Sequence, residues 1–311
     1  MPARTDSPAV IKLSDEERTT GVLTASNLYE AVAAFHRDGL VVLDNAIPVQ
    51  IIDKLNDRMM IDTDRIVKGT VKGVHWNQGI ECGNLSQVPP LEKGYMFPEI
   101  YANKSASTVL TNILGPKPEL HYVRSNTLIG HAPERQDVHK DIKGKHLPVP
   151  TAIAMNVCLI DAHAKNGSTE VWLGTHREQS FDDFVDPTLK SGDVKKSSLE
   201  KRKLVRPPIQ PNLKKGSLVL RDLRLWHAGM NNETDDIRVM LALVYSASWY
   251  KNPLLPPWPV SIKSEIESLG AINNTWVGGT FYDDEGGKKD YLAIEFDGNF
   301  GTSMEDLMAI A

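Results

Sequence analysis

The chain has 311 residues, of which 41% are hydrophobic and 24% charged, with a formal net charge of −5 at pH 7. These values are typical of a soluble globular protein with a sizeable core, and the acidic balance argues against nucleic acid or an anionic membrane as the main partner. Because residues 1–20 lack a signal-peptide core and no stretch approaches the roughly 18–20 apolar residues of a membrane span, we expect a cytoplasmic protein.

The first third of the chain has apolar residues at helical spacing. Ser26 is the expected N-cap of the first helix and Gly39 its stop, with a short buried strand over 39–43 directly after it. Residues 68–98 are rich in Gly, Asn and Pro, so an irregular segment is expected there. The three expected helices are Leu28–Phe35, Ile47–Met60 and Ala102–Leu114.

After the third expected helix, the sequence pattern changes to short runs of β-favouring residues separated by Gly, Asn and Pro. These expected strands are Leu120–Ile129, Ala152–Ile160, Thr169–Leu173, Ser217–Leu220, Leu223–Trp226 and Arg238–Trp249. Without helices between them, such strands favour an antiparallel sandwich or barrel over a parallel sheet. We expect one domain over 1–311 with its core at about 28–250, and residues 182–211 as a surface loop or a lid.

Two histidines and an aspartate carry the first chemical signal. Asp141 lies two residues after His139, and in an extended strand this spacing puts both side chains on one face. His227 comes much later, at the end of an apolar run. This donor set binds Fe(II) through one face and leaves the other positions open for a co-substrate and O₂. A His-x-Asp pair also occurs at the ends of ordinary surface strands, so both interpretations stay open at this point.

Arg238 is a candidate partner for the carboxylate of a co-substrate. If the co-substrate is 2-oxoglutarate, its far carboxylate needs a fixed cation, and the planar fork of arginine suits a carboxylate best. Arg238 stands eleven residues after His227, beyond a turn-forming connection that can bring it beside the His227 strand. The alternative is a surface arginine paired with Asp235 or Asp236.

Four motifs in order resemble the phytanoyl-CoA dioxygenase family, whose members are Fe(II)- and 2-oxoglutarate-dependent oxygenases. The likeness runs from about residue 28 to 250, and the block that ends in Leu173-Gly174-Thr175-His176 departs from the usual Pro-Gly-Ser-His of the family. The motifs are Phe35-His36-Arg37-Asp38-Gly39, His139-Lys140-Asp141, Asn166-Gly167-Ser168-Thr169 with the block after it, and Trp226-His227-Ala228-Gly229 followed by Arg238.

The resemblance implies a mainly β fold with flanking helices and a double-stranded β-helix (jelly roll) core. It implies that His139, Asp141 and His227 bind iron and that Arg238 holds the distal carboxylate of 2-oxoglutarate. Gln136 and Thr169 match positions near the co-substrate in the fungal natural-product branch. The implied cofactors are therefore Fe(II), 2-oxoglutarate and O₂.

The expected function is a dioxygenase that oxidises a small, largely apolar molecule, by hydroxylation, desaturation or rearrangement, in secondary-metabolite biosynthesis. The alternatives are a jelly-roll protein that binds a small ligand without turnover, and a hydroxylase that acts on a protein or an acyl-CoA. A monomer or a homodimer is expected, with no nucleic-acid or membrane partner. Since Cys82 and Cys158 are the only cysteines, a cysteine-rich zinc site is excluded.

Overall fold

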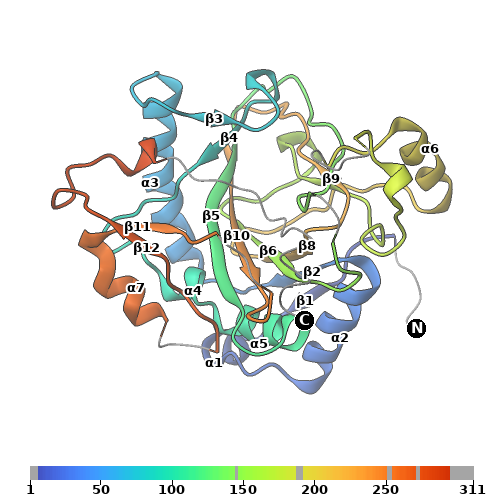
Figure 1. The fold of residues 1–311 in the computed structure, drawn as a ribbon, viewed down its shortest axis with the longest axis horizontal. Coiled ribbons are helices and arrows are strands. Elements are labelled where there is room, and N and C mark those ends of the chain that lie inside the picture. The colour runs from blue at the N-terminus through green and yellow to red at the C-terminus, as the bar shows by residue number, and fades with distance from the viewer. Residues whose placement is uncertain (1–5, 144–145, 187–191, 251–253, 271–273, 295–311) are drawn as a thin grey trace.

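The computed structural model describes residues 6–143, 146–186, 192–250, 254–270 and 274–294, and its centre is a large, mostly antiparallel sheet (Figure 1). The architecture is mixed α and β, with the predicted flanking helices around the central sheet. In spatial order the eight strands of this sheet are β1 (Val10–Lys12), β2 (Leu40–Asp44), β8 (Leu218–Asp222), β6 (Ala152–Cys158), β10 (Arg238–Ser246), β5 (Glu119–Leu128), β4 (Asn84–Gln87) and β3 (His75–Trp76).

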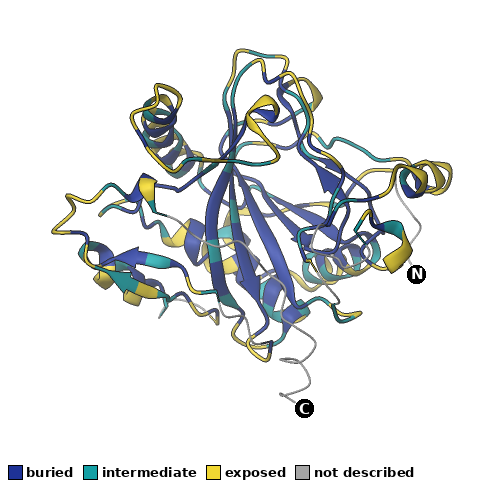
Figure 2. Cartoon of the chain, turned by 45° about the horizontal axis from the view of Figure 1, so that its top comes forward, coloured by how far each residue is buried: buried dark blue, intermediate teal, exposed yellow. Residues whose placement is uncertain are grey.

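The two faces of this sheet have different tasks, because successive side chains of a strand point to opposite faces. On β10, Val239, Leu241 and Leu243 pack into the main hydrophobic core. The alternate residues Met240 and Ala242 line a cavity on the other face. Figure 2 shows the strands of the central sheet almost entirely buried. The sheet is therefore a wall between the core and the cavity.

Most of the helices cover the core face of the sheet, whereas the helix at 196–205 packs against a separate apolar cluster that includes Trp226. In α2, Thr24 rather than the expected Ser26 is the N-cap, because its hydroxyl accepts a hydrogen bond from the Asn27 N–H. Gly39 ends this helix with φ 77°, and a Cβ there would lie 2.5 Å from His176 Nδ1, so both conformation and space require glycine. The helices are α1 (Asp15–Thr20), α2 (Ala25–Asp38), α3 (Val49–Val67), α4 (Pro98–Tyr101), α5 (Lys104–Leu114), α6 (Lys196–Val205) and α7 (Lys263–Leu269).

Two smaller sheets complete the fold: β7 (Glu170–Val171) with β9 (His227–Ala228), and β11 (Pro257–Pro259) with β12 (Thr280–Tyr282). The expected strand Leu223–Trp226 is wrong, because these residues form a turn. The Asp222 carboxylate accepts from the Arg224 N–H at 2.9 Å, and the Leu225 N–H donates to the Asp222 carbonyl at 3.0 Å. This turn carries the chain from the large sheet to β9.

Two other expectations need correction. The segment 182–211 is not a loop throughout, since α6 lies within it, and the buried Arg202 of this helix donates to the Leu173 carbonyl at 2.7 Å. The segment 68–98 is not wholly irregular, because it contributes β3 and β4 to the large sheet. Proline and glycine flank these strands and obscured them in the sequence.

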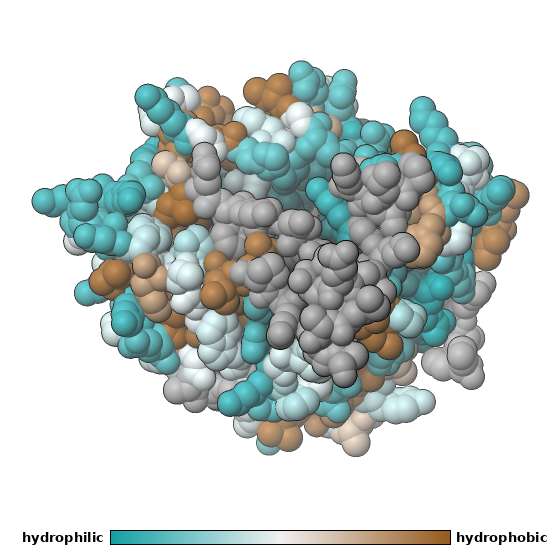
Figure 3. All heavy atoms as spheres, viewed as in Figure 1, coloured by the Kyte–Doolittle hydropathy of each residue, from teal (hydrophilic) through white to brown (hydrophobic). Residues whose placement is uncertain are grey.

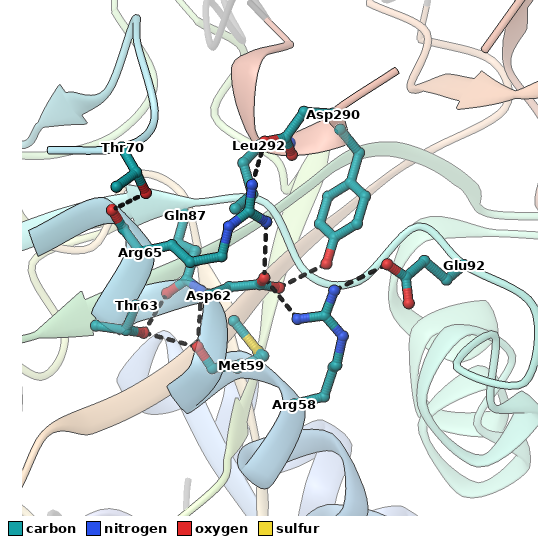
Figure 4. A network of polar contacts seen from close by, with 11 residues as sticks. Arg58, Met59, Asp62, Thr63, Arg65, Thr70, Gln87, Glu92, Asp290 and Leu292 are labelled. Carbon is teal, nitrogen blue, oxygen red and sulfur yellow. Dashed lines mark hydrogen bonds and ion pairs between the residues drawn. The ribbon is translucent and has the colours of Figure 1, made fainter. Parts of the chain in front are cut away.

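A polar network attaches the segment Asp290–Leu292 to α3 (Figure 4). The fully buried Asp62 accepts from Arg58 and from the Tyr291 hydroxyl, each at 2.5 Å. Arg65 on the same helix pairs with Asp290. These bonds hold Leu292 in the wall of the cavity.

The face of the molecule in Figure 3 mixes hydrophobic and hydrophilic side chains. Among the described residues, no helix combines the length and the apolar surface that a bilayer crossing requires.

Candidate metal and co-substrate site

A cavity of about 960 Å³ lies between the large sheet and the β7–β9 pair. This volume falls within the usual range for small-molecule sites. Every residue that the sequence singled out as functional contributes to its wall: Gln136, His139, Asp141, Thr169, His227 and Arg238.

The two histidines and the aspartate converge in this cavity, and their ligand atoms all lie within 4.8 Å of one another. Asp141 Oδ1 is 3.5 Å from His227 Nε2 and 3.8 Å from His139 Nε2. Ligands about 2.1 Å from a shared metal at right angles would be roughly 3 Å apart, so small side-chain adjustments bring the three atoms onto one ion.

Main-chain hydrogen bonds fix both histidines. His139 and His227 exchange a pair of backbone N–H to carbonyl bonds, each 2.9 Å long, which sets their side chains on the same face. Their Nδ1 atoms lie 2.8 Å from the Asp137 carbonyl and 3.0 Å from the Leu225 carbonyl. In the tautomer that donates from Nδ1 to these carbonyls, Nε2 of each ring keeps a lone pair that can bind a metal.

The electrostatics also suit a cation. Burial alone would raise the pKa of Asp141, but the Arg221 guanidinium and the two imidazoles outweigh it and hold the pKa below its ordinary value. Burial, followed by the positive charge of Arg221, lowers the pKa of His227 well below 6.5. At neutral pH the site therefore presents a carboxylate and a neutral imidazole at these two positions, the protonation states that metal binding requires.

Arg238 is the strongest sign of an anionic ligand. Its side chain is buried, with 2% of the residue exposed, and its Nε and Nη1 atoms have no hydrogen-bond partner among the described residues. Burial lowers its pKa to about 10. It is therefore not the surface arginine of the alternative interpretation. A buried guanidinium with two unused donors fits the distal carboxylate of 2-oxoglutarate.

Gln136 and Thr169 line the same cavity, but their contacts differ. The Gln136 side-chain oxygen accepts from the Gly229 N–H at 2.8 Å, and its Nε2 reaches the Asn77 carbonyl only at 3.4 Å. Thr169 immediately precedes β7 and is partly exposed to the cavity. Their roles toward the co-substrate stay predictions.

Sequence reasoning missed the residues that the large sheet brings to this site. Arg221 of β8 donates to Asp141 Oδ2 at 2.7 Å. Tyr122, Arg124 and Asn126 alternate along β5 and face the cavity. The alternation along β5 could have placed the last three on one face, but only the register between strands shows that this face meets His139 and Asp141.

Comparison with known proteins agrees with this geometry. The family model described as Phytanoyl-CoA dioxygenase (PhyH) matches residues 35–240, well over half of the chain. The ectoine dioxygenase of Sphingopyxis alaskensis is 26% identical over 231 residues, which are 69% of this chain and 74% of that protein.

Solved structures show the same fold. The structure of EctD from S. alaskensis with 2-oxoglutarate and 5-hydroxyectoine has a TM-score of 0.56 at 22% identity, covering 78% of this chain and 81% of that one. AviO1 from Streptomyces viridochromogenes Tue57 has a TM-score of 0.51 at 20% identity, covering 76% of this chain and all of that one. The jelly-roll core expected from the sequence is confirmed. By the family match and the clustered donor set, the chain belongs to the phytanoyl-CoA dioxygenase family and is an Fe(II)- and 2-oxoglutarate-dependent dioxygenase.

Proposed function

We propose that His139, Asp141 and His227 hold the iron of this dioxygenase. The convergence of two imidazole Nε2 atoms and one carboxylate oxygen on the cavity supports the assignment. The donor set is the one that leaves positions open on Fe(II) for a co-substrate and O₂. When bound, iron and 2-oxoglutarate supply the oxidising power: O₂ is consumed, 2-oxoglutarate becomes succinate and CO₂, and a substrate C–H bond is oxidised.

Arg238 would hold the far carboxylate of 2-oxoglutarate. Its Nε and Nη1 donors, which find no hydrogen-bond partner in the part of the chain that the structure describes, are the support, because a buried unpaired charge is costly unless a ligand pairs with it. Gln136 and Thr169 would contact the co-substrate or keep its surroundings in place, since both line the same cavity. The remaining work of the protein is to orient the two reactants and to exclude water.

The proposed substrate is a small, largely apolar molecule. The cavity volume of about 960 Å³ suits a ligand of this size, and apolar side chains from separate elements contribute to its wall, among them Met240, Val244 and Leu292. We also propose that the chain acts in secondary-metabolite biosynthesis, in the fungal natural-product branch of its family. Gln136 and the block Leu173-Gly174-Thr175-His176 support this placement.

We further propose that 1–311 is a single domain and that the described part of 182–211 acts as a lid over the iron site. The Lys140 N–H donates to the Gly192 carbonyl at 3.1 Å, and the backbones of Asp193 and His139 form an antiparallel β-bridge. Both Gly192 and Asp193 line the cavity, so this segment lies directly beside the metal-binding residues.

The convergence of His139, Asp141 and His227 carries the assignment, and a direct experiment tests it. The purified protein is incubated with Fe(II), 2-oxoglutarate and O₂, and succinate is quantified with and without a metabolite extract. Even without substrate, slow succinate formation is expected; mass spectrometry of the extract should show a gain of one oxygen or a loss of two hydrogens. A protein that binds Fe(II) and 2-oxoglutarate but never forms succinate would refute the function.

A further inference from the structure

Arg221 contacts the carboxylate of the proposed iron site through Oδ2, whereas the histidine Nε2 atoms lie nearest Oδ1. It belongs to β8, is 7% exposed, and lines the cavity. We propose that Arg221 is a positioning residue that restricts Asp141 to binding the metal through one oxygen, and so keeps open the position that 2-oxoglutarate needs. This inference rests on the proposed iron site.

The two oxygens of Asp141 face different partners. Oδ1 faces the imidazole Nε2 atoms of His227 and His139, at 3.5 and 3.8 Å. Oδ2 accepts a charge-assisted hydrogen bond from Arg221 Nη2 at 2.7 Å. Protein carboxylates bind metals through one oxygen or through both. A guanidinium that occupies Oδ2 competes with the second mode.

The placement of Arg221 is not explained by packing alone. Its Nη1 lies 3.2 Å from His227 Nδ1, and that ring nitrogen carries the proton when Nε2 of the neutral ring binds a metal. Two N–H groups that face each other form no hydrogen bond. The Asp141 carboxylate is therefore the contact that holds the guanidinium in this unfavourable position.

A nearby ion pair shows what a structural arginine looks like in the same stretch of chain. Arg224 binds Asp222 through Nε at 2.9 Å and Nη2 at 2.6 Å, and both side chains are buried. Neither residue lines the cavity. Arg221 and Arg224 are thus a matched pair: two buried arginines three positions apart, each bound to an aspartate, of which only one faces the iron site.

The consequence concerns the open coordination positions. Three protein ligands leave about three positions on a six-coordinate ion, of which a chelating co-substrate takes two and O₂ the third. If Oδ2 were free, Asp141 could occupy one of them and compete with 2-oxoglutarate. Loss of Arg221 also removes a positive charge close to the position where 2-oxoglutarate, a dianion, would bind.

The test separates metal binding from co-substrate binding. Arg221→Met removes the donor and the charge; Fe(II) affinity is measured anaerobically by titration, and 2-oxoglutarate affinity by the charge-transfer absorption of the iron complex. We expect the metal Kd to stay within about threefold of wild type or to fall, and the 2-oxoglutarate Kd to rise at least about tenfold. Arg224→Met is the control, and both of its Kd values should stay within about threefold of wild type.

Arg221→Lys returns a cationic donor and Arg221→Gln a neutral one, so this pair carries the test if the methionine variant does not fold. At equal metal affinity, the lysine variant should bind 2-oxoglutarate at least about threefold more tightly than the glutamine variant. Equal 2-oxoglutarate affinities in these variants, or a loss of metal and co-substrate affinity in parallel with the melting temperature, would overturn the proposal. Failure of the iron site itself is seen separately, as unchanged metal binding in His139→Ala.

Discussion

Replacement of Arg238 by methionine should stabilise the protein without ligands and weaken its binding of 2-oxoglutarate. Burial lowers the pKa of this guanidinium from 12.5 to about 10. At 1.36 kcal/mol for each tenfold change in proton affinity, the charge costs the folded state about 3 kcal/mol. Because the folded pKa is the lower one and both values lie above 7, this cost is fully present at neutral pH.

The unliganded Arg238→Met variant should therefore unfold at a higher denaturant concentration, with a gain of up to about 3 kcal/mol less whatever packing the guanidinium provided. Its affinity for 2-oxoglutarate should fall by on the order of 2–4 kcal/mol, or roughly 30- to 1,000-fold, because the carboxylate loses a buried cationic partner. Chemical denaturation of the metal-free protein measures the first effect. Succinate formation against 2-oxoglutarate concentration measures the second.

Arg224→Met is again the matched control, with the opposite sign for stability. That arginine neutralises the buried Asp222, so its loss should destabilise the protein by about 3–5 kcal/mol. An Arg238→Met variant that loses stability as Arg224→Met does, or that keeps its 2-oxoglutarate affinity, would refute the argument that this guanidinium is buried for an absent anion.

Three further predictions concern the proposed iron ligands, the loss of stability at low pH, and the contact between Asp62 and Tyr291. Substitution of His139 or Asp141 by alanine should abolish succinate formation while thermal unfolding of the metal-free protein changes little; residual turnover in either variant would exclude that residue as a ligand. Burial lowers the pKa of His176 to about 4, so the unfolded state binds the proton more tightly and stability should fall as pH drops from 6.5 to 4, by up to about 3 kcal/mol. The free energy of unfolding, measured by denaturation across this pH range, should depend less steeply on pH in His176→Asn than in the wild type. An identical pH dependence would show that His176 is not the cause. Asp62→Asn should cost on the order of 3 kcal/mol, because the amide keeps one acceptor oxygen for two donors, Arg58 and the Tyr291 hydroxyl, and Arg58 loses a buried anionic partner. Hydrogen exchange should show faster opening of Tyr291–Ala293 in this variant, and unchanged protection there would show that Asp62 does not anchor the segment.

Much of the large sheet follows from sequence periodicity. The expected strands 120–129 and 152–160 differ from β5 and β6 by at most two residues at their ends. The agreement is good because the apolar residues of these strands are buried, so their pattern is visible in the sequence. The strand expected at Leu223–Trp226 failed because an apolar run is compatible with a buried turn as well as with a strand. The Asp222 side chain decides between them by bonding to the backbone that follows.

The site shows the same division. The ligand types and their spacing predicted which residues meet, and the three donors do converge. Arg221 could not be assigned a role, because its contact with Asp141 joins residues 80 positions apart and depends on how β8 is placed relative to the His139-Lys140-Asp141 segment. Contacts set by strand register leave no local pattern in the sequence.

The paired backbone bonds between His139 and His227 have a consequence for how this chain can vary. His139 pairs with His227 in an isolated β-bridge, so a shift of one residue in this pairing would turn the imidazole away from the site. Insertions and deletions near the active centre should therefore be tolerated in the turns between strands and lethal to activity within this short ladder. The spacing inside the motif is protected by geometry even where the identity of the neighbouring side chains is not.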